Sequence, residues 1–373
     1  MGTVLKSNIV FGELLRGGLW EEDVNLSQAE RIDYERIFLL SQEQSVTGLI
    51  AAGLEHTKGV SIPQDVTLMF ASVALQLEHR NLAMNHFIEE LVGRMREADL
   101  FPILVKGQGI AQCYNRPLWR AAGDVDLLCG NDYNKAVAFL APLATEIKEE
   151  GYYKRHYPFI IDSWEVELHG SLRCGLWRRL DNTLDDVQNS VFCDGTVRTW
   201  MNGRTQVFIP RADEDVFFVF THIIQHFFKE GIGLRQICDW CRLLWTFRGK
   251  INNELLKSRL KSAGILSEWK VFAAFAVNYL GMPKDAIPFY SSKSCWNKKS
   301  KRVLNYILET GNFGHNRDLS YYGKNTKIER KAISLWRHTK DSVTYLFIFP
   351  IDAIKVWGKM IDVGIKDFFK RQR

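Results

Sequence analysis

The hydrophobic pattern of the chain changes twice, and each change marks a switch in the secondary structure that the residues favour. Up to about residue 100, apolar residues recur at helical spacing, most clearly from about Pro63 to Asp99. From Phe101 to about residue 212, short apolar runs and polar–apolar alternation are typical of strands. Helical spacing returns from Asp213. The pattern therefore predicts an α+β core between helical regions.

The 373 residues are enough for several domains, and the pattern divides them into four regions. We expect an N-terminal helical region at 1–100, an α+β core at 101–212, a helical domain at 213–290, and a basic segment followed by a C-terminal amphipathic helix at 291–373.

The net charge of +6 is concentrated in one part of the chain. Residues 293–340 hold twelve Lys and Arg against three Asp and Glu, a net charge of +9, so the remainder carries −3. Because the basicity belongs to one segment, it does not require that the whole protein bind nucleic acid. Aromatic residues between the charges could stack on bases, but we favour a solvated arm whose aromatic residues dock on the body of the protein.

The sequence predicts a cytoplasmic protein with reduced thiols. Seven cysteines is an odd number, and the N-terminal residues lack the apolar core of a signal peptide. No apolar run is long enough to form a transmembrane helix, since the run at 343–351 is short and contains Pro350. The apolar spacing near the C-terminus would also suit a helix on a membrane surface, but docking in the core is favoured.

Asp124 and Asp126 lie two residues apart in a predicted strand, so both carboxylates should lie on one face. Val125 and Leu127 would then pack on the other face. Two neighbouring carboxylates repel each other unless a cation lies between them. Mg²⁺, or Mn²⁺ in its place, takes such oxygen ligands and can bridge the phosphates of a nucleotide. The pair therefore predicts a divalent-metal site.

A third carboxylate is offered by the predicted strand from Trp164 to His169. Glu165, Glu167 and His169 share one face of that strand. We expect Glu167 to position a second metal or act as a base, with Glu165 as the next candidate. The same alternation also fits the solvated face of an edge strand.

The turn at Lys106-Gly107 follows a predicted strand at 101–105 and precedes a predicted helix at 110–114. A glycine lets the backbone approach phosphate oxygens, and a helix N-terminus presents free amides to anions. Lys106 and Arg120 could add charge-assisted contacts to a triphosphate. Both could equally be solvated surface charges.

Taken together, these residues resemble the uncharacterised nucleotidyltransferase family of the polymerase-beta-like superfamily. The resemblance covers roughly residues 35–250, and nucleotidyltransferase toxins of abortive-infection systems are more distantly similar. It is carried by Leu104-Val-Lys-Gly107, Tyr114, Arg120, Gly123-Asp-Val-Asp-Leu-Leu128, Glu167-Leu-His169, His222, His226 and Leu234-Arg-Gln-Ile-Cys-Asp239. Two departures are the turn Lys-Gly-Gln-Gly, where the superfamily has Gly-Ser or Gly-Gly, and the alanines after Arg120.

The resemblance implies a polymerase-beta-like core, a small mixed sheet with helices, flanked by helical regions. It also implies that the catalytic and metal-binding residues are Asp124, Asp126 and Glu167. The nucleotide-binding residues that it implies are Lys106, Gly107, Gln108, Arg120, His169, His222, His226 and Asp239. The histidines could instead tie helices together, and the Cys238–Cys241 pair is expected to be structural rather than a zinc site.

The implied reaction moves a nucleoside monophosphate from a nucleoside triphosphate to an acceptor hydroxyl, with Mg²⁺ or Mn²⁺ as the cofactor. The acceptor could be a small molecule, a protein or RNA. One alternative is a phosphotransferase that uses the same site. The other is a non-catalytic nucleic-acid-binding or assembly protein on this fold.

Overall fold

The computed structural model describes residues 2–27, 32–148, 155–193, 197–317 and 327–370. The helices are α1 (Gly2–Trp20), α2 (Tyr34–Glu43), α3 (Thr47–Glu55), α4 (Gln64–Glu97), α5 (Gly107–Ala111), α6 (Tyr133–Leu140), α7 (Arg178–Cys193), α8 (Ala212–Lys229), α9 (Leu234–Thr246), α10 (Asn253–Ala263), α11 (Leu266–Leu280), α12 (Ser294–Thr310), α14 (Lys327–Leu346) and α15 (Pro350–Lys370). The strands are β1 (Val24–Asn25), β2 (Thr57–Lys58), β3 (Ile103–Val105), β4 (Val125–Leu128), β5 (Glu146–Ile147), β6 (His156–Ile161), β7 (Trp164–His169), β8 (Arg198–Asn202) and β9 (Thr205–Ile209).

The main sheet is mixed and has the strand order β5-β6-β7-β4-β3-β9-β8. Strands β4 and β7 pair in parallel, as do β3 and β9, whereas the other neighbours are antiparallel. The expected mixed sheet with flanking helices is therefore confirmed. The short strands β1 and β2 form a separate parallel pair.

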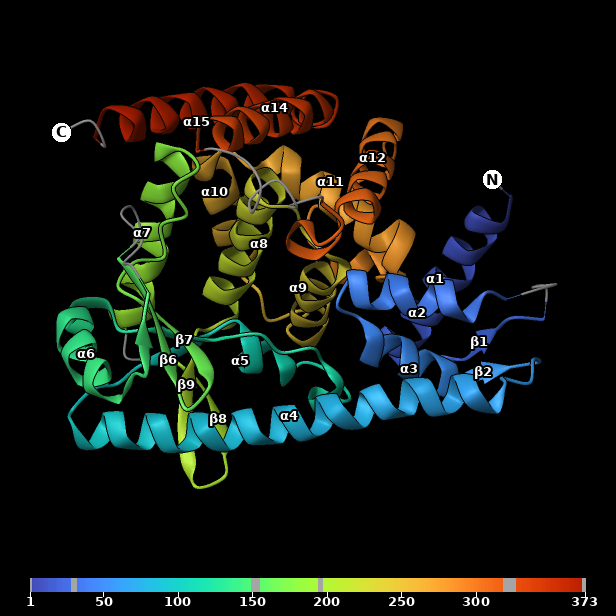
Figure 1. Cartoon of the computed structure of the whole chain (residues 1–373), viewed down its shortest axis with the longest axis horizontal. Coiled ribbons are helices and arrows are strands. Elements are labelled where there is room, and N and C mark those ends of the chain that lie inside the picture. The colour runs from blue at the N-terminus through green and yellow to red at the C-terminus, as the bar shows by residue number, and fades with distance from the viewer. Residues whose placement is uncertain (1, 28–31, 149–154, 194–196, 318–326, 371–373) are drawn as a thin grey trace.

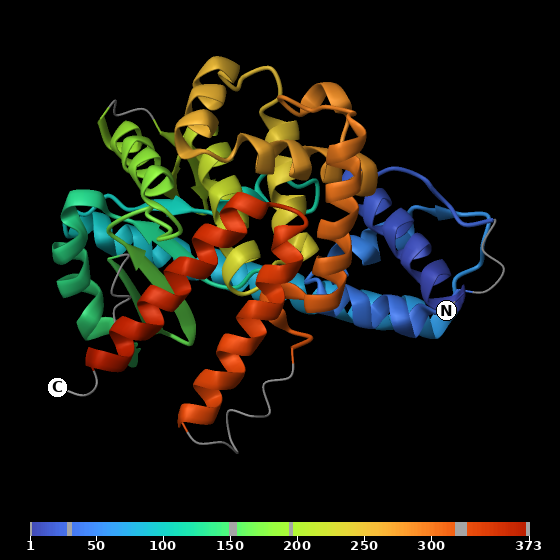
Figure 2. The same cartoon turned by 90° about the horizontal axis from the view of Figure 1, so that it is seen from above.

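Two layers of helices enclose this sheet. Helix α4 runs along one face, and α8 and α9 lie over the other (Figure 1). Seen from above, α4 continues past the sheet toward α1 and α3, while α14 and α15 cross the side opposite α4 (Figure 2). The sheet is therefore buried on both faces along its central strands.

Strand alternation explains which residues meet α4. Val125, Leu127 and Val166 are almost fully buried and pack in one cluster with Ile88 and Leu91 of α4. Because successive side chains of a strand point to opposite faces, the intervening Asp126 must face α8 and α9. Packing against α4 thus aims an acidic residue at the helical layer.

The predicted strands of the core are present with small changes in their bounds. Strand β7 has the predicted bounds, and β3 and β4 lie inside the predicted runs, whereas β6 begins at His156 rather than at Phe159. The helix expected at 110–114 begins at Gly107 and ends at Ala111. The predicted strands do not include the β8–β9 hairpin, although Asn202-Gly203 is a typical signal for a tight turn.

The basic segment is largely helical, and its charges are solvated as expected, since Lys298 and Lys301 are exposed. Among its aromatic residues, Tyr306 docks on the body as predicted, whereas Trp336 is exposed. Helix α12 buries Val303 and Ile307, and α14 follows after residues 318–326, which lie outside the described residues.

The C-terminal helix docks through Ala353 and Val356, which are buried. The apolar residues from which docking was predicted do not make this contact, since Ile351, Ile354 and Trp357 are exposed. In the described part of the chain, no helix is both long enough and apolar enough to cross a membrane.

Candidate active site

The register between β4 and β7 brings three carboxylates together. Asp126 lies opposite Glu167 in this parallel pair, and Val125 lies opposite Val166. Asp124 precedes β4 on the same face. Each of the three acidic residues offers a carboxylate oxygen, and these oxygens lie within 4.8 Å of one another. The predicted juxtaposition of Glu167 with the aspartates is therefore confirmed.

Asp126 is the most buried member of the cluster, with 2% of its surface exposed. Its Oδ1 atom lies 2.8 Å from Nζ of Lys106 and 2.7 Å from Nε2 of His169. Burial alone would raise the pKa of Asp126, but Lys106 and His169 outweigh burial and hold it far below its usual range. An ionised carboxylate can only accept a hydrogen bond, so we infer that Nε2 of His169 carries the hydrogen.

Asp124 has the opposite character. The negative charge of Asp126, and then burial, raise the pKa of Asp124 to about 6, although Lys106 opposes this. Burial lowers the pKa of Lys106, but the surrounding carboxylates outweigh burial and raise it overall. Glu167 keeps a lowered pKa, because His156 and Lys106 offset its burial. One ammonium group thus faces three carboxylates.

A cavity of about 520 Å³ opens on this cluster. A line of contacts follows its wall: Nζ of Lys106 lies 3.2 Å from Nε2 of His222, which lies 2.9 Å from Nε2 of His226. The His226 ring in turn meets the Phe313 ring edge-on at 4.9 Å. The predicted site residues that line the cavity are Lys106, Gly107, Arg120, Asp124, Asp126, Glu167, His222, His226 and Asp239.

Arg120 and Asp239 form a buried ion pair at the edge of this cavity. Nε and Nη2 of Arg120 each donate to a different oxygen of Asp239 at 2.7 Å, and the Tyr114 hydroxyl donates to the same carboxylate at 2.8 Å. Two parallel bonds of this kind fix both side chains. The guanidinium of Arg120 is therefore committed to Asp239 rather than directed at the carboxylate cluster.

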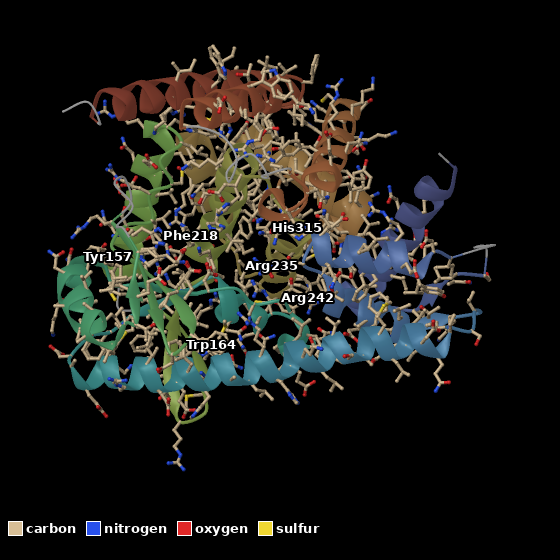
Figure 3. The ribbon with its side chains drawn as sticks, viewed as in Figure 1. Tyr157, Trp164, Phe218, Arg235, Arg242 and His315 are labelled. Carbon is tan, nitrogen blue, oxygen red and sulfur yellow. The ribbon has the colours of Figure 1, made fainter. Side chains whose placement is uncertain are left out.

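Arg235 lines the cavity too, and it was not singled out from the sequence. It lies between the upper helices and the sheet, whereas Trp164 lies beside α4 (Figure 3). Nη1 of Arg235 donates to the Ala121 carbonyl at 2.8 Å. Its Nε atom is shielded from solvent and makes no hydrogen bond with any described residue. The only sequence signal for Arg235 is that it lies within Leu234-Arg-Gln-Ile, which is part of the family resemblance.

Two of the predicted nucleotide-binding residues lie elsewhere. The Gln108 side chain is 2% exposed, and its Nε2 atom donates to the side-chain oxygens of Asn81 and Asn85 on α4. It ties the turn to α4 and does not line the cavity. His169 lines a smaller neighbouring cavity of about 200 Å³.

The structure also brings in residues that the sequence analysis did not select. His156 joins the cluster from β6, with its Nε2 atom 2.8 Å from Oε2 of Glu167. Asn312 and Phe313, from a short turn after α12, line the far wall of the larger cavity. No local pattern marks these residues, because they reach the site through tertiary packing.

The fold and the site define a class of protein: a mixed-sheet domain whose central strands carry a three-carboxylate centre beside a cation-lined cavity. A model of the uncharacterised nucleotidyltransferase family matches residues 30–281, more than half of the chain, so the chain belongs to this family. It is therefore a transferase of nucleotidyl groups. No curated protein and no solved structure matches the chain.

The raised pKa of Asp124 generates a stability prediction for the metal-free protein. Above about pH 6 the folded protein must hold Asp124 ionised beside Asp126, which the unfolded chain does not. Asp124→Asn should therefore raise the melting temperature at pH 8 in chelator, and the gain should shrink at pH 5, where the wild-type carboxyl is protonated.

Asp285→Asn removes an exposed carboxylate elsewhere and provides the control, with no such pH dependence expected. An equal loss of stability for Asp124→Asn at both pH values would contradict the proposed repulsion.

A substitution at Gln108 can test whether its side chain stabilises the fold or binds the nucleotide. Gln108→Leu leaves Asn81 and Asn85 without their buried partner, so it should lower the free energy of unfolding by about 1–3 kcal/mol. Nucleotide affinity of the folded variant should stay unchanged. Gln64→Leu, at an exposed glutamine where α4 begins, is the control and should change neither quantity. A lower nucleotide affinity with unchanged stability would instead show that Gln108 contacts the nucleotide.

Proposed function

We propose that the chain transfers a nucleoside monophosphate from a nucleoside triphosphate to an acceptor hydroxyl, on a polymerase-beta-like core. The observation that carries this proposal is the convergence of Asp124, Asp126 and Glu167 within 4.8 Å at the wall of a large cavity, in a member of a nucleotidyltransferase family. The family supports the class of reaction, and the geometry of the cluster supports the assignment of these three carboxylates to the active site.

The residues fit a divalent cation. Carboxylate oxygens are the ligands that Mg²⁺ and Mn²⁺ take, and three carboxylates exceed the single charge of Lys106. Both short contacts of Asp126 use Oδ1 rather than Oδ2. Asp124, Asp126 and Glu167 would hold the metal, which when bound would neutralise phosphate charge and lower the pKa of the attacking hydroxyl.

The phosphates would lie along the cationic side of the cavity. The Lys106 ammonium stays charged, and the Nε atom of Arg235 has no described partner, so both are suited to phosphate oxygens. Gly107 has a φ of +42°, and a Cβ atom there would meet the Asp124 carbonyl at 3.4 Å. A glycine therefore keeps this turn close to the carboxylates. Arg120 would act indirectly, by holding Asp239 and the wall in place.

In the proposed reaction the acceptor oxygen attacks the α-phosphorus. A new oxygen–phosphorus bond forms, the bond from that phosphorus to pyrophosphate breaks, and the acceptor proton leaves to water. The chain's own contribution is to hold the triphosphate in line with the acceptor and to compensate its charge.

The nucleobase is proposed to lie against Phe313. This side chain is 46% exposed although it is aromatic, and it lines the cavity at the far end of the contacts that begin at Asp126. Its φ of +51° is uncommon for a residue with a side chain, and such strain is often found at ligand sites. Stacking on an aromatic ring binds any base, so Phe313 would add affinity without selecting one base.

Labelled substrate tests the reaction. With α-labelled nucleoside triphosphate, Mg²⁺ or Mn²⁺, and candidate acceptors, we expect transfer of the label and release of pyrophosphate. Glu167→Gln should lower the rate by about a hundredfold or more, since removal of one transition-state contact costs that much in other enzymes. Glu165→Gln, the neighbouring acid of the same strand, is the comparison variant and should retain more activity. A parallel reaction with γ-labelled nucleoside triphosphate tests the alternative. Transfer of that label with release of the nucleoside diphosphate would make the chain a phosphotransferase.

Phe313→Ala separates base binding from phosphate binding. It should weaken nucleoside triphosphate binding by roughly tenfold, since stacking contributes about 1–3 kcal/mol. Inorganic tripolyphosphate should bind as before, because it has no base. Phe347→Ala removes an exposed phenylalanine at the end of α14 and should affect neither ligand. Equal weakening of both ligands by Phe313→Ala would contradict the stacking role.

A further inference from the structure

A second group of metal-type donors lies beside the carboxylate cluster. The antiparallel register of β6 and β7 pairs His156 with His169, and their rings stack with centroids 4.7 Å apart and planes inclined by 12°. Both Nε2 atoms approach the same oxygen, Oε2 of Glu167, at 2.8 Å from His156 and 3.7 Å from His169. The donor atoms of these three residues lie within 4.8 Å of one another.

The Nε2 atom of His156 has an unusual environment. It is shielded from solvent and makes no hydrogen bond with any described residue, although it lies near Glu167, because the two atoms are not aligned for one. A buried nitrogen whose nearest neighbour is not aligned for a hydrogen bond is costly, and such atoms are rare in folded proteins. An imidazole nitrogen and a carboxylate oxygen that converge without a hydrogen bond are suited to sharing a cation.

The ligand chemistry distinguishes this group from the aspartates. Asp124 and Asp126 offer oxygen alone, which suits Mg²⁺. Imidazole nitrogen favours transition metals such as Fe²⁺, Co²⁺ and Zn²⁺. Mn²⁺ prefers oxygen but also accepts imidazole nitrogen, for which magnesium competes poorly. The smaller cavity of about 200 Å³, lined by all three residues of the group, would give a cation and its waters access.

We propose that His156, Glu167 and His169 hold a second divalent cation of transition-metal type, next to the all-oxygen site of Asp124 and Asp126. Glu167 belongs to both groups and would bridge the two ions. The site takes from the proposed function only the assignment of the aspartates. To bind, His169 moves its hydrogen from Nε2 to Nδ1, so the imidazole stays neutral and no proton is released.

This arrangement makes the centre asymmetric. In two-metal phosphoryl-transfer sites the ions lie about 3.5–4 Å apart, and each has its own ligand set. Here one set would contain two imidazoles and the other none. The histidine side would stay loaded with its transition metal, while the ion on the aspartates could enter with the nucleotide.

The test uses the full chain, freed of metal by a chelator and titrated with Mn²⁺ alone. We expect tight binding of a Mn²⁺ ion whose pulsed EPR spectrum shows coupling to imidazole nitrogen, before any nucleotide is added. His156→Phe keeps a stacked ring without the ligand nitrogen, so it should reduce that coupling and weaken the tight site by roughly tenfold or more. His86→Phe, at an exposed histidine of α4, should leave both unchanged.

A wild-type spectrum without nitrogen coupling overturns the proposal, and so does His156→Phe with unchanged Mn²⁺ affinity. The wild-type spectrum decides alone if the variant does not fold. This outcome is separable from the proposed function. Failure of the histidine site would leave Mg²⁺-dependent nucleotide binding intact, whereas failure of the proposed function would leave nitrogen-coupled Mn²⁺ without nucleotide binding.

Discussion

The site depends on the parallel pairing of β4 with β7. This pairing places Asp126 beside Glu167 only because Val125, Val166 and their neighbours are buried against α4. Side chains alternate along a strand, so a slip of one residue would turn the acids into the apolar layer. The buried apolar face therefore fixes the position of the acidic face, and the long helix α4 acts as the support of the site.

The charges of the cluster show how the fold tolerates three acids in one place. Lys106 follows directly after β3 and reaches Asp126, while His169 donates to the same oxygen. These contacts compensate the charge of Asp126. Asp124 is instead repelled by Asp126, and this repulsion, with burial, raises its pKa to about 6. A cluster in which one carboxylate is compensated and another is repelled favours the binding of a cation.

Much of the core followed from local sequence, because alternation and spacing are local properties. The strands around Asp124 and Glu167, and the faces their side chains take, could be predicted in this way. Gln108 shows the limit, since the family resemblance implied nucleotide binding for it, while its side chain turns to α4. Phe313 and Arg235 could not be placed because long-range packing brings them to the cavity. His156 required the β6–β7 register, which no single segment encodes.

The central claim is that nucleotide binding depends on a metal held by the carboxylate cluster. The most direct measurement is the free energy of unfolding with nucleoside triphosphate alone, Mg²⁺ alone, and both together. At a hundred times the dissociation constant, a ligand that binds only the folded state adds about 2.7 kcal/mol. We predict a gain of this size only with both ligands in the wild type, and its loss in Asp124→Asn. The same gain from nucleotide without metal, or an undiminished gain in Asp124→Asn, would contradict the account.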